Sequence, residues 1–384
     1  MFNLNYLYEF RKKLHRIPEI AFNEFQTQEL IKNQLNTYKQ LKLTEFQPTG
    51  LLYEYSQGTG DYLLFRADMD ALPIQEKTEC NFMSQNNGFA HACGHDIHMT
   101  ILIGLIHYVI KNNLKINILF LFQPAEEGSG GAEHILKTGI FNNYNIEAAF
   151  ALHVSGEYTL GQIGLKSGII FGIPQEFNIE FFGKSGHVAT PHKGNDALIA
   201  AMAFYSEMNT LLNKRFPAQD AVIFHIGKAN AGTVRNIIPD YCKLEGTSRC
   251  LTKTNKEKIN QLMLKVAEGI KQSYEIDVKV SLLSSYDPVV NNEKLVSLTH
   301  SLLSDTSIEI INVDSSMTGE DFGFFTTLYP GMLFWLGTHN PKSNKNKEDL
   351  HSSKFLPDEK SIETALQLYK KILDYKLKHS YLLN

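Results

Sequence analysis

The sequence has few cysteines, a single tryptophan and no long apolar run. Its four cysteines, at positions 80, 93, 242 and 250, show neither the spacing of a disulfide scaffold nor a C-x-x-C motif. The most apolar stretch, "ILIGLIHYVI" at 101–110, is too short to cross a bilayer. The first residues lack the apolar core and cleavage site of a secretory signal. We therefore expect neither a secreted disulfide-rich domain nor a membrane protein, and the cytoplasm is the expected location.

An excess of basic charge is also missing. The chain carries 37 Lys and Arg residues against 41 Asp and Glu residues, for a formal net charge of −4. This balance argues against a nucleic-acid partner. The 384 residues, of which 43% are hydrophobic, are enough for a large buried core and for two domains.

The first 174 residues alternate helical and strand patterns. Near-continuous apolar strands, such as "DYLLFRAD", "INILFLFQP" and "EAAFALH", are separated by helices near 24–38 and 96–111. This pattern is typical of a mostly parallel sheet covered by helices on both faces. The same pattern resumes at 288–384, with a helix near 293–303, the strand "GMLFWLG" and a helix from about 358.

A different order occupies residues 175–287. It runs strand, helix, strand, strand, helix, strand, from "EFNIEFFG" to "DVKVSLLSS". This is the order of a ferredoxin-like βαββαβ unit. We therefore predict an α/β domain, made from 1–174 and 288–384, with a ferredoxin-like domain inserted into it.

Reactive side chains follow several of the predicted strands. Carboxyl ends of parallel strands meet at one edge of a sheet, where α/β folds bind ligands. The residues are Asp68 and Asp70 after "DYLLFRAD", Glu126 and Glu127 after "INILFLFQP", and His153 at the end of "EAAFALH". Cys93 and His95 in "HACGHDIHMT" lie at the amino end of the next predicted helix, so they can face the same edge. A single histidine after a strand is more often a hydrogen-bonded structural residue than a ligand. Several such segments without a matching basic cluster point to bound cations.

The donor types narrow the choice of cation. A mixture of thiolate, imidazole and carboxylate suits Zn²⁺, Mn²⁺, Co²⁺ or Ni²⁺, and argues against the oxygen-only sites of Mg²⁺ or Ca²⁺. Two such ions about 3.5–4 Å apart form hydrolytic centres in which a water is activated and a carbonyl is polarised. A nearby free carboxylate would then move the proton.

Eight motifs in order resemble the M20 metallopeptidases of the amidohydrolase subgroup, over residues 10 to about 360. They are "LHRIPE", "RADMDALPI", "HACGHDIHM", "FQPAEEG", "ALH", "GHVATPH", "TGEDFG" and "DLH". The resemblance implies a di-metal exopeptidase-like catalytic domain with an inserted lid and dimerisation domain. It also implies a homodimer or higher homo-oligomer.

The resemblance assigns roles residue by residue. It implies that two divalent transition-metal ions are held by Cys93, His95, Glu127, His153 and His351. Glu126 matches the general base that activates the water, and Asp70 matches the carboxylate that orients a metal-bound histidine. Asp68, two residues earlier on the same strand, is kept as a further contributor.

The inserted domain contributes three further matches. His187 resembles the histidine that stabilises the oxyanion, often in the active site of a neighbouring subunit. Asn236 and Arg249 resemble residues that hold the carboxylate of the substrate. Two departures concern substrate preference: "GTSRC" stands where relatives often have "GTIRT", and the lysine-rich loop 340–350 before His351 is longer than usual.

The implied reaction is hydrolysis of the amide of an N-acyl amino acid. Stretches such as "FLFQPAEEGSGGAEHIL" and "SMTGEDFG" are most similar to N-acetyl-diaminopimelate deacetylases, which release diaminopimelate and acetate for lysine and peptidoglycan precursor synthesis. The alternatives are a hippurate-type or broad N-acyl-amino-acid hydrolase, a dipeptidase or carboxypeptidase, and, in a different class, a catalytically silent metal-binding homologue.

Overall fold

The computed structural model describes residues 2–128, 130–343 and 348–383, and it divides into two compact units. The first unit contains the chain up to Ile170, Val289–Asp314 and the chain from Asp321 onward; the second contains Phe171–Pro288 and Ser315–Glu320. From the sequence we expected Ser315–Glu320 to belong to the first unit. It groups with the second because Ser316 pairs with Phe171 and accepts a hydrogen bond from the Gly172 amide at 2.8 Å. Residues 344–347 of the lysine-rich loop lie outside the described residues.

Helices and strands of the first unit alternate along most of the chain. The helices are α1 (Leu4–His15), α2 (Phe25–Leu35), α3 (His95–Lys111), α4 (Gly131–Lys137), the 3-10 turn η1 (Ile140–Asn143), α7 (Glu293–Leu303), α8 (Gly323–Leu328) and α9 (Ser361–His379). The strands are β1 (Leu41–Glu45), β2 (Leu51–Ser56), β3 (Tyr62–Asp68), β4 (Asn117–Gln123), β5 (Ile146–Thr159), β6 (Gln162–Leu165), β7 (Gly168–Phe171), β14 (Val289–Asn291), β15 (Glu309–Asn312) and β16 (Gly331–His339).

These strands form one mixed sheet. Within the described residues it has ten strands, in the order β1-β2-β4-β3-β5-β16-β14-β7, with β6 paired to β16 and β15 paired to β6. The central strands β4, β3, β5 and β16 are parallel, whereas β2 and β1 continue the sheet antiparallel beside β4. Every residue of β4 is buried, which explains its uninterrupted apolar sequence. The predicted mostly parallel, helix-covered sheet is confirmed.

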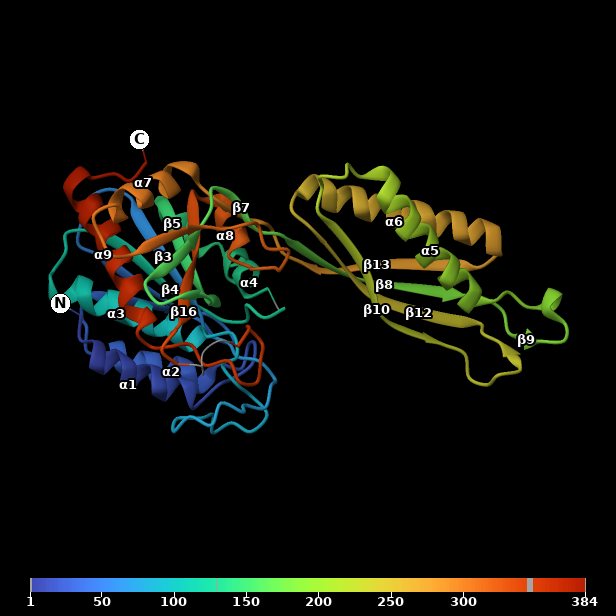
Figure 1. The fold of residues 1–384 in the computed structure, drawn as a ribbon, viewed down its shortest axis with the longest axis horizontal. Helices are drawn as coiled ribbons and strands as arrows, with labels where there is room; N and C mark the ends of the chain where they lie inside the picture. Colours follow the sequence, from blue (N-terminus) through green and yellow to red (C-terminus); the bar gives the residue numbers. More distant parts are fainter. Residues whose placement is uncertain (1, 129, 344–347, 384) are drawn as a thin grey trace. The chain divides into compact units, whose positions relative to one another are not determined.

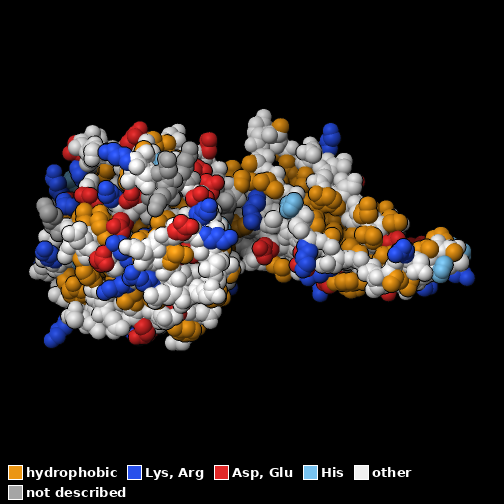
Figure 2. All heavy atoms as spheres, turned by 60° about the horizontal axis from the view of Figure 1, so that its bottom comes forward, with side chains coloured by type: hydrophobic (Ala, Val, Ile, Leu, Met, Phe, Trp, Pro, Cys, Tyr) orange, Lys and Arg blue, Asp and Glu red, His pale blue; other side chains and the backbone are white. Residues whose placement is uncertain are grey.

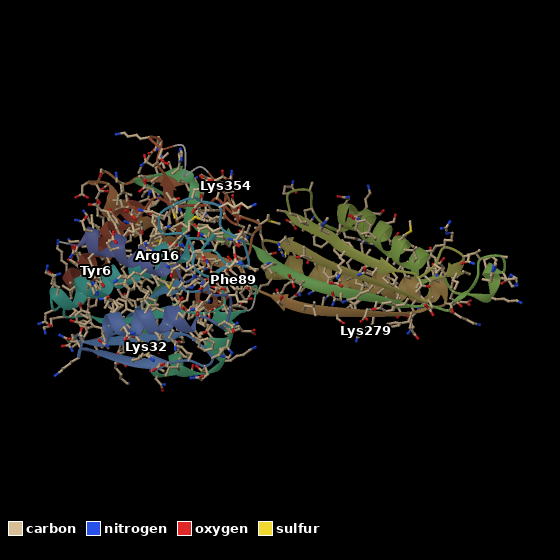
Figure 3. All side chains as sticks on the ribbon, turned by 90° about the horizontal axis from the view of Figure 1, so that it is seen from below. Tyr6, Arg16, Lys32, Phe89, Lys279 and Lys354 are labelled. Carbon is tan, nitrogen blue, oxygen red and sulfur yellow. The ribbon has the colours of Figure 1, made fainter. Side chains whose placement is uncertain are left out.

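Helix α3 is buried on nearly all sides, so its hydrophobic residues surround the helix and form no single stripe. It packs against β3 and contacts both α1 and α9 (Figure 1). Side chains fill the space between the sheet and its helices (Figure 3). This packing fixes the amino end of α3, where His95 lies, relative to the carboxyl end of β3. None of the described helices is long and apolar enough to span a membrane.

The second unit has the expected βαββαβ order. Its elements are β8 (Ile173–Phe182), β9 (Gly186–His187), the 3-10 turn η2 (Pro191–Lys193), α5 (Ala197–Arg215), β10 (Val222–Ala231), β11 (Ile237–Ile238), β12 (Tyr241–Cys250), α6 (Lys253–Tyr274) and β13 (Asp277–Ser285). The sheet order is β10-β12-β8-β13, and each pair of neighbours is antiparallel. Helices α5 and α6 lie side by side on one face of this sheet and share its apolar core (Figure 1).

Strand β5 differs from the sequence-based expectation. We expected it to end at His153, but it continues to Thr159 because β16 pairs with it beyond that point, from Trp335 opposite His153 to His339 opposite Thr159. His153 therefore lies inside a strand and not at its end. It still reaches the cluster described below, because the pairing of β3 with β5 ends at Phe65–Phe150, before His153.

Candidate metal centre

Two neighbouring parallel strands deliver the acidic residues. Asp68, the last residue of β3, pairs in register with Gln123, the last residue of β4. Asp70 follows the first of these strands by two residues, and the turn after the second carries Glu126 and Glu127. The sheet thus brings both pairs of carboxylates to the same edge, as the sequence pattern predicted.

Cys93 and His95 enter the same region through a tight approach to α3. The residue between them, Gly94, has φ +80°, and a Cβ placed on it would lie 2.4 Å from a methyl carbon of Val154. Only glycine fits this conformation without a clash. The two side chains therefore flank a point where the backbone touches β5.

The five predicted ligands come together. The Cys93 Sγ lies 3.3 Å from His153 Nε2 and 3.4 Å from His351 Nε2, and His351 Nε2 lies 3.3 Å from Glu127 Oε1. Overlapping groups have ligand atoms within 4.8 Å of one another: Cys93 with His95 and His153, Cys93 with Glu127 and His351, and His95 with Glu126 and Glu127. Because these groups share members, they suit two adjacent metal ions.

Backbone carbonyls set the tautomers of two histidines. His95 donates from Nδ1 to the Asp70 carbonyl at 2.8 Å, and His153 donates from Nδ1 to the Val154 carbonyl at 2.9 Å. In both rings Nε2 is then the nitrogen with a free lone pair. Within the described residues His95 Nε2 is buried and has no hydrogen-bond partner. Such a buried, unpartnered acceptor fits a metal ligand.

The electrostatics of the cluster favour a cation. Burial raises the pKa of the Cys93 thiol, and the charges of Glu127 and Glu126 raise it further. Burial also lowers the pKa of His153 to about 3, so its imidazole stays neutral. A neutral imidazole and an anionic thiolate are the forms that bind metals, and a divalent ion supplies the charge that the thiolate needs.

Asp70 supports the cluster in two ways. Its Oδ2 accepts a hydrogen bond from the Glu127 amide at 2.9 Å, and its Oδ1 lies 3.4 Å from His95 Nδ1. The resemblance implied that the Asp70 carboxylate orients the His95 ring. The Asp70 backbone carbonyl makes the closer contact to this ring, so the carboxylate and the backbone share that role.

Asp68 is enclosed by cationic and imidazole groups. Its Oδ2 accepts from Arg66 at 2.7 Å and its Oδ1 accepts from His98 Nδ1 at 2.6 Å. The side chain is fully buried, and Arg66 also bonds to Asp321 at 2.7 Å. Asp68 therefore contributes to the framework beneath the cluster.

Glu24 fixes the turn that carries Glu126 by a hydrogen bond to its backbone. Ala125 has φ +58°, a left-handed conformation that is unusual for alanine, and its amide donates to Glu24 at 2.9 Å. Thr49 donates to the other oxygen of Glu24. Burial, together with the charge of Asp70, raises the pKa of Glu24 to about 7. Sequence reasoning missed Glu24, because it precedes the turn by about a hundred residues and belongs to none of the strand ends.

His98 was also left without a role. It is one of the three histidines of "HACGHDIHMT", and its spacing of three from His95 places both on one face of α3, which was the available signal.

The three candidate residues of the second unit occupy different ends of it. His187 lies on β9 and Asn236 directly precedes β11, and these two strands pair, so the structure brings the two exposed residues together. Arg249 lies near the end of β12, opposite Pro174, whereas the β9–β11 pair adjoins the other end, where Tyr241 pairs with Phe182. The eight residue steps from Tyr241 to Arg249 span roughly 25 Å.

Comparisons with known proteins agree over nearly the whole chain. Residues 64–375 match the model of peptidase family M20/M25/M40. The N-acetyldiaminopimelate deacetylase of Bacillus pumilus (strain SAFR-032) is 38% identical over 372 residues, covering 96% of this chain and 97% of that protein. The protein of the same name from Bacillus subtilis (strain 168) is 37% identical over 361 residues, covering 93% and 95%.

Solved structures show the same architecture. A putative aminohydrolase from methicillin-resistant Staphylococcus aureus superposes with a TM-score of 0.91 at 25% identity, over 97% of this chain and 96% of that one. A dinuclear metal-binding peptidase of the M20 family from Bacillus subtilis gives a TM-score of 0.83 at 29% identity, over 98% of both chains.

Proposed function

Because the chain belongs to peptidase family M20/M25/M40, we propose that it is a metal-dependent amidohydrolase that deacetylates N-acetyl-LL-diaminopimelate. The observation that carries this proposal is the meeting of Cys93, His153, His351 and Glu127 beside Glu126. Its substrate is supported by relatives named N-acetyldiaminopimelate deacetylase that align along almost their full length.

The donor set fits two divalent transition-metal ions, as in the dinuclear relative. The residues that would hold them are Cys93, His95, Glu127, His153 and His351. When bound, the ions activate a water molecule and polarise the scissile carbonyl. Zn²⁺, Mn²⁺, Co²⁺ and Ni²⁺ all suit this mixture of sulfur, nitrogen and oxygen.

Glu126 moves the proton in this scheme. Its buried carboxylate shares a group with His95 and Glu127, so it lies at the cluster itself. It accepts a proton from the attacking water and passes it to the amine nitrogen as the amide C–N bond breaks, which yields acetate and diaminopimelate. Asp70 fixes the Glu127 amide, and Glu24 fixes the Ala125 amide, so the turn holds Glu126 in place.

Replacing Glu126 tests the reaction. Glu126→Gln keeps the size of the side chain but removes the base, so turnover of N-acetyl-diaminopimelate should fall by about 10²-fold or more. Metal content, measured by mass spectrometry of the purified protein, should stay the same. The exposed Glu133→Gln on α4 is the control and should remain active. Activity of Glu126→Gln near the wild-type level would reject the proposed base.

The substrate assignment is tested on the same preparation. Metal-loaded protein is incubated with N-acetyl-diaminopimelate, hippurate and simple N-acetyl amino acids, and amine release is measured. Preference for hippurate or for the simple N-acetyl amino acids would retain the amidohydrolase but reject the diaminopimelate substrate.

A second copy of the chain is the partner we propose for the second unit. Hydrophobic side chains gather on the surface of this unit (Figure 2), and α5 exposes Leu198, Ile199, Met202 and Tyr205. Because His187 lies on the separate β9–β11 pair beyond one end of the four-stranded sheet and Arg249 lies near its other end, they suit two different active sites better than one. In a homodimer, His187 and Asn236 of one copy would complete the active site of the other, with His187 stabilising the oxyanion.

The cytoplasm is the compartment we propose. All four cysteines are free, and three of them are buried. Unpaired thiols of this kind are typical of a reducing compartment.

A further inference from the structure

His98 joins two elements beneath the metal centre. It is a fully buried residue of the first turn of α3, and its ring bonds on both sides. Nδ1 contacts Asp68 Oδ1 at 2.6 Å, and Nε2 accepts a hydrogen bond from the Val154 amide at 3.0 Å. The ring thus connects the carboxyl end of β3 to the middle of β5.

These partners determine the protonation of the ring. The Val154 amide can only donate, so His98 Nε2 is an acceptor, and the proton of the neutral ring is on Nδ1, directed at Asp68. The ligand atoms of Asp68, His95 and His98 lie within 4.8 Å of one another, which resembles a metal site. However, the only lone pair of His98 is already used by Val154. His98 is therefore not available as a ligand.

The pairing of β3 with β5 leaves one backbone amide of β5 without a strand acceptor, and His98 accepts its hydrogen bond. The ladder between β3 and β5 ends at the pair Phe65–Phe150 in the described part of the sheet. Beyond it the buried Val154 amide has no strand partner on the β3 side, and leaving a buried amide without a hydrogen bond is unfavourable. His98 supplies the missing acceptor.

The Val154 backbone in turn sets a metal ligand. Its carbonyl accepts the Nδ1 proton of His153 at 2.9 Å, which turns His153 Nε2 toward Cys93 Sγ. Asp68 is itself fixed by Arg66 at 2.7 Å. A chain of hydrogen bonds therefore runs from Arg66 through Asp68 and His98 to the backbone that orients His153.

We propose that His98 is a positioning residue, which locks the Val154 backbone so that His153 presents Nε2 to the metal centre. The proposal rests on the proposed function, because it requires that His153 bind an ion. It assigns Asp68 the role of an anchor for His98. Removing one such supporting partner of a ligand typically lowers metal affinity 10–100-fold.

Three variants of His98 test the proposal. His98→Leu removes both hydrogen bonds, His98→Gln keeps an amide that can accept from Val154, and His98→Asn has a shorter amide that reaches only toward Asp68. The control is His107→Gln, on the same helix but outside the network. Trp335 is the only tryptophan, and its ring lies 5.3 Å from that of His153, so its fluorescence reports ion binding without any measurement of activity.

We expect folded His98→Leu to bind Zn²⁺ or Co²⁺ about tenfold or more weakly than wild type. His98→Gln should recover most of this loss, and His107→Gln should match wild type. Circular dichroism establishes folding; if His98→Leu does not fold, the comparison of His98→Asn with His98→Gln replaces it, with Asn the weaker binder. Equal affinity of the folded variants and wild type would overturn the proposal, as would equal losses in Gln and Leu, or in Gln and Asn. Wild-type protein that binds no ion would instead refute the metal centre itself.

Discussion

Cys93 illustrates how a single residue depends on the ion that it is expected to bind. Its thiol is buried, and both burial and the nearby carboxylates of Glu127 and Glu126 raise its pKa. On these grounds alone the sulfur would keep its proton near neutral pH. A divalent ion reverses the balance, because coordination stabilises the thiolate directly.

Cys93→Ser should therefore weaken metal binding by an order of magnitude or more, because a serine hydroxyl has a much higher pKa than a thiol and is a poor anionic ligand. The matched control is Cys242→Ser, which alters a buried cysteine of the other unit. Titration of Zn²⁺ followed by Trp335 fluorescence measures the effect. Unchanged affinity in Cys93→Ser would show that this residue is structural.

The sequence motifs predicted which residues meet at the candidate site, but not which hydrogen bonds hold them in position. Cys93, His95 and Glu127 could be found because thiols, imidazoles and acids at strand ends and at the beginning of a buried helix are conspicuous. The role of His98 could not be found, because it depends on where the β3–β5 ladder ends, and strand register is not written in either segment alone. Glu24 escaped for a related reason: its partner is a backbone amide.

Among the elements, α1 is fastened to the beginning of α3 by a buried charge network. Arg11 and His15 of α1 both contact Asp96 Oδ2 at 2.7 Å, and the other nitrogen of His15 lies 3.1 Å from Glu76. Burial and Arg11 lower the pKa of His15, but Asp96 and its hydrogen bond raise it more strongly, to about 10. Asp96 directly follows His95, so this network fixes the end of the helix that carries a predicted ligand.

The raised pKa predicts how stability changes with pH. In the unfolded chain His15 has a pKa of about 6.5, so its folded-state charge stabilises the protein fully below that pH. The contribution is lost as pH rises toward 10. His15→Gln should lower the free energy of unfolding at pH 7 and flatten its decline between pH 7 and 9, which we expect to be on the order of 1 kcal/mol per pH unit in the wild type.

Urea unfolding of chelator-treated protein, followed by Trp335 fluorescence at pH 7, 8 and 9, measures this change without a contribution from metal binding. The control is the exposed His300→Gln on α7, which should keep the wild-type slope. An identical slope in His15→Gln and wild type would contradict a charged His15.

The elements themselves were predicted unevenly. Buried central strands and α3 stand out as apolar runs bounded by polar residues, and their positions were predicted to within a few residues. The edge strand β1 was missed because its residues are exposed or half-buried and show no apolar run. The extension of β5 to Thr159 was missed because it depends on pairing with β16, which lies about 180 residues away in the sequence.

For the whole molecule, the second unit raises the question of what its exposed apolar surface contacts. Met202 of α5 is 64% exposed and Ile199 is 53% exposed, although both belong to a helix whose other face is buried in the core of the unit. A twofold dimer, which is the commonest form of oligomer, would bury this surface. It would also explain why His187 and Arg249 lie toward opposite ends of the second unit.

Subunit complementation distinguishes this arrangement from a monomeric active site. If His187 acts across the dimer, Glu126→Gln and His187→Ala are each inactive alone. A hybrid of the two then has one doubly mutated site and one intact site, with Glu126 from one copy and His187 from the other. Hybrids isolated by two different affinity tags should show about half of the wild-type activity per dimer. If His187 acts within its own chain, both sites of the hybrid carry one mutation and no activity returns. Pairing Glu126→Gln with the double variant is the control, because neither arrangement gives it an intact site.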